Sequence, residues 1–95
     1  MIWVKTSSAY PEQYDIYTNS GLYTAYFRLR HGNLYVHPIK HGEIDWDTVL
    51  FEKHYYDERG CFEDNDQTEF TRLKIKINFK IRFYRLKETI LNLLY

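Results

Sequence analysis

The chain has 95 residues, 44% of them hydrophobic and 27% charged, a composition that predicts a single globular domain over residues 1–95 rather than a disordered chain. Thirteen Lys and Arg balance thirteen Asp and Glu, so net charge does not indicate a polyanionic partner. The single cysteine, Cys61, excludes a scaffold held by internal disulfides. The apolar runs are too short for a spanning helix and Met1–Lys5 does not resemble a secretion signal, which predicts a cytoplasmic protein without a membrane partner.

Aromatic residues make up 19% of the chain, a proportion that can indicate base-stacking or protein-binding surfaces. The six residue types with AT-rich codons, Phe, Tyr, Ile, Asn, Lys and Met, number 37, whereas Gly, Ala, Arg and Pro number only 14. Coding bias is therefore an alternative explanation for the tyrosine content, since an AT-rich host, or a virus or mobile element living in it, would leave this signature. Only the positions of the rings along the chain can support a functional argument.

Four segments of the first half carry β-prone side chains bounded by turn residues, and the predicted strands are Ile2–Thr6, Gln13–Thr18, Leu22–His31 and Leu34–Ile39. The last two form a central hairpin over residues 22–39, because Gly32-Asn33 suits a two-residue turn. Pairing His31 with Leu34 then places the apolar side chains on one face. The polar and aromatic side chains on the other face are Tyr26, Arg28, Arg30, Tyr35 and His37.

Three further elements follow the hairpin. Val49–Phe51 is a short predicted strand, and Lys74–Tyr84 is a longer one, because isoleucine or phenylalanine stands at every second position from 75 to 83. A helix is the alternative for this region, with Asp66 as its cap and an apolar stripe at Phe70, Leu73, Ile77, Ile81 and Tyr84. The β-branched residues and the unbroken alternation favour the strand. Helical spacing of the apolar residues predicts a short helix over Arg85–Leu94.

These elements predict a small two-layer α+β domain, with an antiparallel sheet of about four to five strands, the central hairpin, and a C-terminal helix packed on one face. Within this fold the acidic and basic residues are segregated. Ten of the thirteen acidic residues lie between 43 and 69, and a run of seven cations without an acidic residue lies between 72 and 87. The two segments would form oppositely charged poles, or the acidic segment would fold over the basic face and neutralise it.

A basic face with interleaved rings is typical of proteins that bind single-stranded nucleic acid, because cations contact phosphates and rings stack on bases. If the last strand and the hairpin share a sheet, the candidate residues are Tyr26, Arg28, Arg30, Tyr35, Lys74, Lys76, Lys80 and Arg82, with Tyr84 beside them. Lysines on an outer strand face are also ordinary solvation and protect an edge from aggregation. This nucleic-acid interface is therefore the second hypothesis for function.

No assembled catalytic or metal motif is present in the sequence. His37 and His41 with Asp45 and Asp47 lack a spacing that closes a metal site, and Asp64-Asn65-Asp66 lacks the remaining positions of a calcium loop. Cys61 looks like a small apolar residue in a turn rather than a nucleophile. We therefore predict no metal, no cofactor and no enzymatic activity. The one catalytic alternative is a small metal-independent RNase-type toxin, whose test group is His31, Arg28, Arg30 and His37.

The leading hypothesis is a non-catalytic interaction protein that presents an aromatic and charged surface to another macromolecule, as an inhibitor or adaptor of a host protein complex. The candidate contacts are Trp46, Tyr55 and Tyr56 with the flanking acids Asp45, Asp47, Asp57 and Glu58. A homodimer is a further expectation, because one short helix does not easily bury an apolar end. That end consists of Leu91, Leu93, Leu94 and Tyr95.

Overall fold

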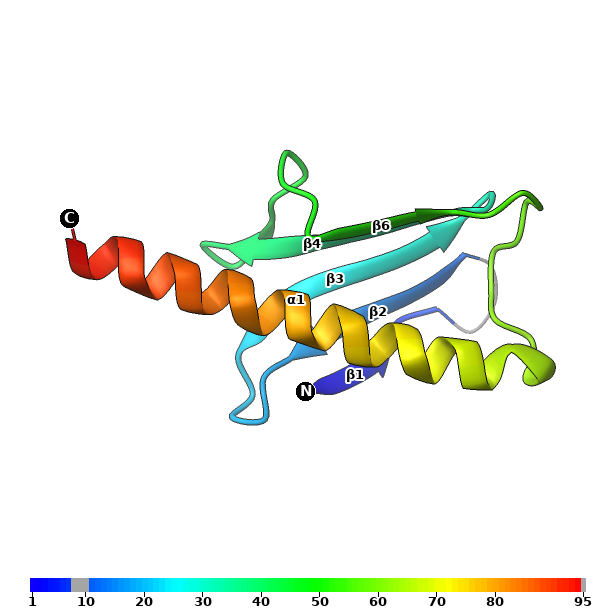
Figure 1. Cartoon of the computed structure of the whole chain (residues 1–95), viewed down its shortest axis with the longest axis horizontal. Helices are drawn as coiled ribbons and strands as arrows, with labels where there is room; N and C mark the ends of the chain where they lie inside the picture. Colours follow the sequence, from blue (N-terminus) through cyan, green and yellow to red (C-terminus); the bar gives the residue numbers. More distant parts are fainter. Residues whose placement is uncertain (8–10, 95) are drawn as a thin grey trace.

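The computed structural model describes residues 1–7 and 11–94 and has two layers, an antiparallel sheet and one long helix laid across it (Figure 1). The predicted α+β class, antiparallel sheet and C-terminal helix are confirmed. The strands are β1 (Ile2–Lys5), β2 (Glu12–Tyr17), β3 (Tyr23–Arg30), β4 (Asn33–Lys40), β5 (Glu43–Ile44) and β6 (Phe51–His54). A 3₁₀ turn, η1 (Asp64–Asp66), leads into α1 (Gln67–Leu94).

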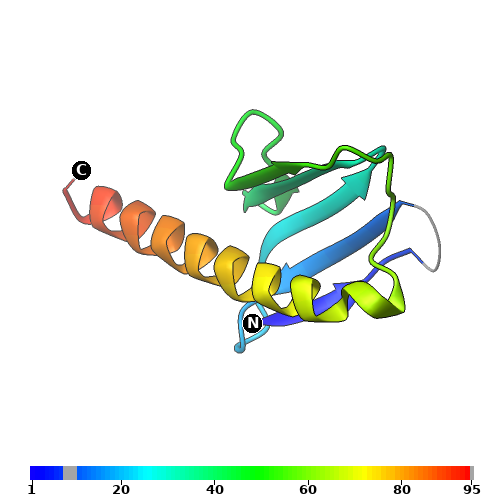
Figure 2. The ribbon, with the colours of Figure 1, turned by 45° about the vertical axis from the view of Figure 1, so that its right-hand side comes forward.

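Strands β1 to β4 form an antiparallel meander in chain order, and β5 and β6 both pair with the free edge of β4. This topology follows from short connections, since consecutive strands joined by tight turns pair as neighbours. The segment after β6 then crosses one end of the sheet to reach the start of α1 (Figure 2). As a result α1 covers one face of the sheet, which we call the inner face, and leaves the other, the outer face, without a helix.

The β3–β4 hairpin is confirmed, but its predicted turn and register are wrong. The turn residues are His31 and Gly32, both at positive φ (51° and 77°), the combination that a type I′ turn requires. Leu29 therefore pairs with Leu34, and Arg28 pairs with Tyr35. The turn lies one residue earlier than expected, so every pairing changes by two positions and each side chain keeps its predicted face.

The core lies between the inner face and α1, and aromatic rings occupy its end near the start of the helix. Phe62 and Phe70 stack with their centroids 4.6 Å apart, and the Trp3 ring contacts both Phe27 and Phe70. The Trp3 indole N–H donates to Asn78 of α1 at 2.8 Å, which ties the edge strand to the helix. The fully buried side chains of the core include Ile16, Phe27, Leu29, Leu34, Val36, Ile77 and Ile81.

The predicted strand over Lys74–Tyr84 is wrong, because this segment lies inside α1. The alternative apolar stripe is the one that packs: Phe70, Leu73, Ile77 and Ile81 are buried against the sheet. An inner face of six strands needs an apolar layer over it, and a strand added at the edge would leave that face in water. Tertiary packing therefore outweighs the β propensity of isoleucine and phenylalanine.

The helix predicted over Arg85–Leu94 is present as the end of α1, but it does not pack on the sheet as expected. Most of its side chains are exposed, and the last turns extend past the sheet (Figure 2). Only Glu88 in this segment is partly buried. Of the residues proposed for self-association, Tyr95 lies outside the described residues.

Candidate functional site

The side of α1 that faces away from the sheet carries a continuous row of exposed apolar side chains. Their spacing of three and four residues places them on one line along the helix, opposite the buried stripe. Their exposed fractions lie between 48% and 81%. We call this row the apolar ridge, and it consists of Ile75, Phe79, Phe83, Leu86, Ile90 and Leu93.

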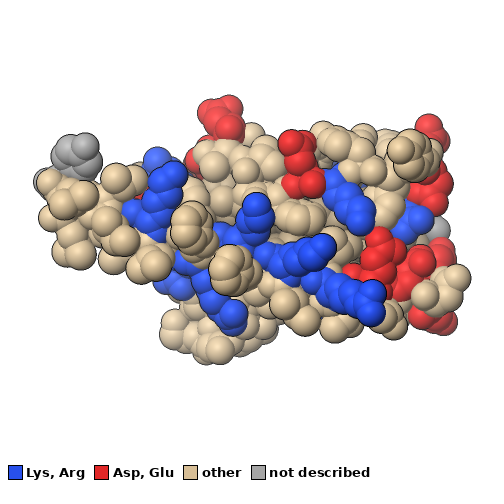
Figure 3. Space-filling view, in the orientation of Figure 1, with Lys and Arg blue, Asp and Glu red and all other residues tan. Residues whose placement is uncertain are grey.

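Cationic side chains flank the apolar ridge on both sides. Lys76, Lys80 and Lys87 follow one flank at helical spacing, and Arg82 and Arg85 follow the other. All five are exposed, and Figure 3 shows lysine and arginine side chains alternating with uncharged residues along the helix. The acidic side chains in this view gather at the other end of the molecule and along the upper edge of the sheet (Figure 3). The ridge is therefore an apolar surface inside a positive field.

A second candidate surface lies on the outer face of the sheet, where β3 and β4 meet their turn. It is a depression with a volume of about 310 Å³, which we call the outer pocket. Cross-strand pairing of Arg28 with Tyr35 and of Arg30 with Asn33 places these side chains side by side. The residues that line the pocket are Arg28, Arg30, His31, Asn33, Tyr35, His37 and Trp46.

The two arginines of the outer pocket form no ion pair with the described residues. Within the described part of the chain, neither Arg28 nor Arg30 lies within 4.0 Å of a carboxylate oxygen. The Nε of Arg28 is buried and has no hydrogen-bond partner among the described residues. A buried N–H donor without a partner is costly, and such a group in a folded protein calls for a specific explanation.

A loop between β5 and β6 covers part of the outer face and places an indole ring at the pocket. Trp46 contacts Tyr26 and His37 edge to face, at centroid distances of 5.8 and 5.1 Å, and remains 58% exposed. His37 is buried, and its Nδ1 lies 2.8 Å from the Thr48 carbonyl oxygen, so this nitrogen carries the proton and donates. The loop is thus fixed to the sheet, and the Trp46 ring is held in place with most of its surface in water.

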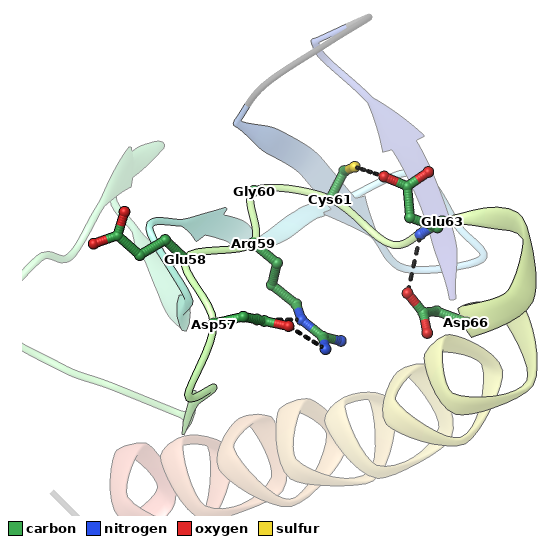
Figure 4. A pocket seen from close by; sticks show the side chains of 7 residues that line it. All are labelled: Asp57, Glu58, Arg59, Gly60, Cys61, Glu63 and Asp66. Carbon is green, nitrogen blue, oxygen red and sulfur yellow. Dashed lines mark hydrogen bonds and ion pairs between the residues drawn. The ribbon is translucent and has the colours of Figure 1, made fainter.

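A third depression lies between the segment after β6 and the start of α1, and its polar groups are largely paired with one another (Figure 4). Arg59 donates two hydrogen bonds to Asp57, at 2.8 and 2.9 Å, and its guanidinium lies 4.2 Å from the centroid of Tyr55. This pairing lowers the pKa of Asp57 and raises that of Arg59. Burial and the neighbouring Glu69 raise the pKa of Tyr55, whose hydroxyl donates to Glu69 at 3.2 Å. The contacts anchor this segment to α1.

The structure divides the residues predicted to bind a partner between different places. Asp45, Trp46 and Asp47 lie on the loop over the outer face, and Asp45 accepts hydrogen bonds from Thr48 and from the Asp47 backbone. Tyr55 and Asp57 take part in the contacts that anchor the segment after β6 to α1, and Tyr56 is fully exposed next to them. Glu58 points away from Arg59 (Figure 4) and lines a depression of about 490 Å³ adjoining the outer pocket. These residues therefore do not form one patch.

The predicted nucleic-acid interface also divides. Arg28, Arg30 and Tyr35 lie on the outer face, whereas Tyr26 is covered by Trp46. The four cations Lys74, Lys76, Lys80 and Arg82 lie on α1, beyond the inner face, and Tyr84 is on the same helix. A common basic face of hairpin and last strand is therefore wrong, because the segment that carries the lysines is a helix on the other side of the sheet.

Sequence reasoning missed the apolar ridge, although its signal is in the sequence. An apolar residue at every second position of a helix advances by about 200° per step, so alternate members lie on opposite sides. Ile77 and Ile81 thus face the sheet, and Ile75, Phe79 and Phe83 face water. Read with helical geometry, the alternation from 75 to 83 indicates a helix with two apolar faces.

The outer pocket brings together all four residues of the predicted RNase test group, which are Arg28, Arg30, His31 and His37. Two imidazoles and two guanidiniums in one depression could supply proton transfer and phosphate binding. The described residues contain no group of three or more His, Cys, Asp or Glu side chains arranged to hold a metal ion. Within the described chain, no helix combines the length and apolar character needed to cross a membrane.

Comparisons of the chain with protein-family models, with curated proteins and with solved structures find no match. The apolar ridge and the outer pocket are therefore the features of the molecule that bear on its function.

Proposed function

We propose that this protein is a non-catalytic interaction domain that docks its apolar ridge into a groove of a partner protein, with an apolar floor and acidic rims. Helix-in-groove binding uses anchors at the spacing seen here, three or four residues apart along one helix face. Docking of this kind would allow a small protein to inhibit or adapt a cellular protein complex.

The exposure of the ridge is the single observation that carries the proposal. Phe79 and Phe83 are 69% and 62% exposed, and together they present on the order of 200 Å² of ring and side-chain surface to water. The other ridge residues extend this surface over about five helical turns. Monomeric proteins rarely expose continuous apolar patches of more than a few hundred Å², and larger ones mark interaction sites.

The charges beside the ridge define the partner. Lys80 and Lys87 on one flank and Arg82 on the other would lie against the rims of any groove that receives the ridge. If a second copy of α1 were the occupant, cations would face cations in both parallel and antiparallel pairing, and each such pair is destabilising. Acidic rims instead complement both flanks and accelerate association.

An anionic membrane is a less suitable occupant, although basic helices with an apolar face often bind such surfaces. The end of the molecule at which α1 begins is acidic, with Glu63, Asp64, Asp66 and Glu69 in and before the first helical turn. A planar anionic surface that contacted the whole ridge would also meet this acidic end and repel it. A groove of limited length avoids this repulsion.

Site-specific photocrosslinking in cells that express the protein tests the proposal. A photoreactive phenylalanine analogue at position 83 is expected to give an adduct of discrete mass with one protein. The same analogue at Val4, which is 46% exposed on the edge strand, provides the control and should give no such adduct. Exchanging Lys80→Glu and Lys87→Glu together should reduce the adduct by about tenfold or more, because the flank would then repel acidic rims.

The charge-conserving variants Lys80→Arg and Lys87→Arg should still give the adduct, since they retain the positive charge. An adduct with a second copy of the chain, an adduct with lipid, or no adduct at all would contradict the proposal. It would also be contradicted if the protein adduct survived reversal of both lysines.

A further inference from the structure

We propose that the outer pocket binds a nucleoside phosphate, with Arg28 and Arg30 on the phosphate and Trp46 stacked on the base. The ligand can come from a free nucleotide or from one residue of a single strand, and both present the same chemistry. This site lies on the outer face of the sheet, and it is independent of the apolar ridge on α1.

Two arginines that form no ion pair within the described part of the chain would bind the phosphate. Arg59 and Lys53 each form an ion pair: Arg59 binds Asp57, and Lys53 lies 3.6 Å from Glu69. Arg28 and Arg30, in contrast, have no carboxylate oxygen within 4.0 Å among the described residues, and both line the outer pocket. A planar guanidinium with free donors matches phosphate oxygens, and charge-assisted hydrogen bonds of this kind are the strong ones.

The turn beside the arginines is held by hydrogen bonds to a distant segment, which favours a pocket formed before any ligand binds. His31 stands at φ 51°, in the left-handed region that costs free energy for a residue with a side chain. The neighbouring Gly32 donates its N–H to the Arg59 carbonyl at 2.7 Å and accepts from the Tyr55 N–H at 2.8 Å. These bonds hold the backbone of the turn, and the His31 side chain carried by the turn lines the pocket. Preorganisation reduces the ordering cost that binding must overcome.

The Trp46 ring is the surface on which the base would stack. The edge-to-face contacts with Tyr26 and His37 hold the indole, yet 58% of the residue remains exposed. A held and exposed aromatic ring is the platform on which bases stack, and every base has a face suited to it. Tyr35 also lines the pocket, whose volume of about 310 Å³ is within the range of small-ligand sites.

One carboxylate, that of Glu58, leads to a prediction in which affinity for the ligand rises rather than falls. Glu58 lines the adjoining depression together with Arg28, Arg30 and His31. A bound phosphate would be repelled by this negative charge across the shared wall. Removing the charge should therefore strengthen binding, whereas removing a guanidinium should weaken it.

Fluorescence of Trp46 provides the direct measurement. The chain has two tryptophans, and Trp3 lies on the inner side, so Trp3→Phe leaves Trp46 as the only tryptophan emitter. Adenosine monophosphate and a single strand of about ten nucleotides are titrated separately at about 50 mM salt, with inorganic phosphate as a third probe. Quenching by both nucleotide probes, and a weaker response to inorganic phosphate, is the expected result.

Variants with matched changes of charge test whether the ligand binds in the outer pocket. Arg30→Gln, at an exposed position, and Arg28→Gln should each weaken binding about tenfold or more, and Glu58→Gln should strengthen it. Arg72→Gln makes the same charge change at an exposed position of α1 and should leave affinity unchanged. Circular dichroism of each variant confirms that the fold is retained, and Arg30→Gln, exposed at the end of β3, keeps the test valid if Arg28→Gln unfolds.

The other possible results either identify the source of the ligand or overturn the proposal. Quenching by the single strand but not by adenosine monophosphate assigns the site to single-stranded nucleic acid. Equal quenching by these two probes at equal occupancy of the site assigns it to free nucleotides. Binding that falls equally in Arg72→Gln and Arg30→Gln would reflect net charge alone and overturn the proposal. Absence of quenching by both nucleotide probes at low salt would overturn it as well, without bearing on the ridge and its crosslinks.

Discussion

Replacement of Ile77 by alanine is expected to lower the free energy of unfolding by about 3 kcal/mol, whereas the same replacement at Ile75 should change it by less than about 0.5 kcal/mol. Ile77 is fully buried between α1 and the sheet, and Ile75 is 64% exposed on the ridge. Removing a buried side chain loses its transfer free energy and leaves a cavity, and neither cost applies at an exposed site. Urea denaturation of the two variants and the parent protein measures the difference.

The pair also distinguishes a helix from a strand in this segment. In a strand, residues 75 and 77 would point to the same face, and their alanine variants would have similar effects. In α1 the two residues are about 200° apart around the axis, so only one of them contacts the core. Equal destabilisation by Ile75→Ala and Ile77→Ala would contradict the helix and would remove the apolar ridge with it.

Replacement of Gly32 by alanine is expected to destabilise the fold by about 3 kcal/mol or more, for two reasons that a second glycine separates. Gly32 has φ 77°, which is unfavourable for alanine, and an added Cβ would overlap the Asp57 carbonyl oxygen. Gly42 has φ 78°, but an added Cβ would meet nothing within 4 Å. Gly42→Ala therefore reports the backbone strain alone, about 1 kcal/mol.

Thermal denaturation followed by circular dichroism compares the two glycine variants. A larger loss at Gly32 than at Gly42 is the expected result, because the segment around Asp57 must move away from the turn. Equal losses would show that this segment does not pack tightly on Gly32. The same substitution should also disturb the outer pocket, since the hydrogen bonds of Gly32 to Arg59 and Tyr55 hold the turn.

The two proposed binding surfaces are on opposite sides of the sheet. The apolar ridge lies on the far side of α1 from the inner face, and the outer pocket lies on the outer face. A partner on the ridge would therefore not block the entry of a nucleotide into the pocket. Crosslinking from position 83 is expected to be unaffected by Arg30→Gln, which makes the two tests independent.

Local pattern was sufficient for most of the sheet. The hairpin was predictable because β-prone runs flank a glycine turn, and the faces of Arg28, Tyr35 and Phe27 were predicted correctly. The exact register was not predictable, because either His31-Gly32 or Gly32-Asn33 can form a two-residue turn. Hydrogen bonds from a segment more than twenty residues away, at Arg59 and Tyr55, hold the turn that forms.

The functional surfaces were less predictable than the elements. The outer pocket contains residues from β3, its turn, β4 and the loop with Trp46, and only the pairing of strands and the folding of that loop bring them together. The arginines and tyrosine were recognisable as one face of a hairpin. Their position opposite to the lysines of α1 depended on the side of the sheet to which the helix packs.

The sequence by itself determined the α+β class, the hairpin faces and the presence of alternating apolar residues from 75 to 83, because these follow from local spacing. Only the tertiary structure decided that the alternation belongs to a helix. Alternate residues are compatible with one face of a strand or with two faces of a helix, and local propensity favours the strand. The uncovered inner face of the sheet resolves this ambiguity, since burying it against Leu73, Ile77 and Ile81 requires a helix. The residues left on the opposite side then form the ridge.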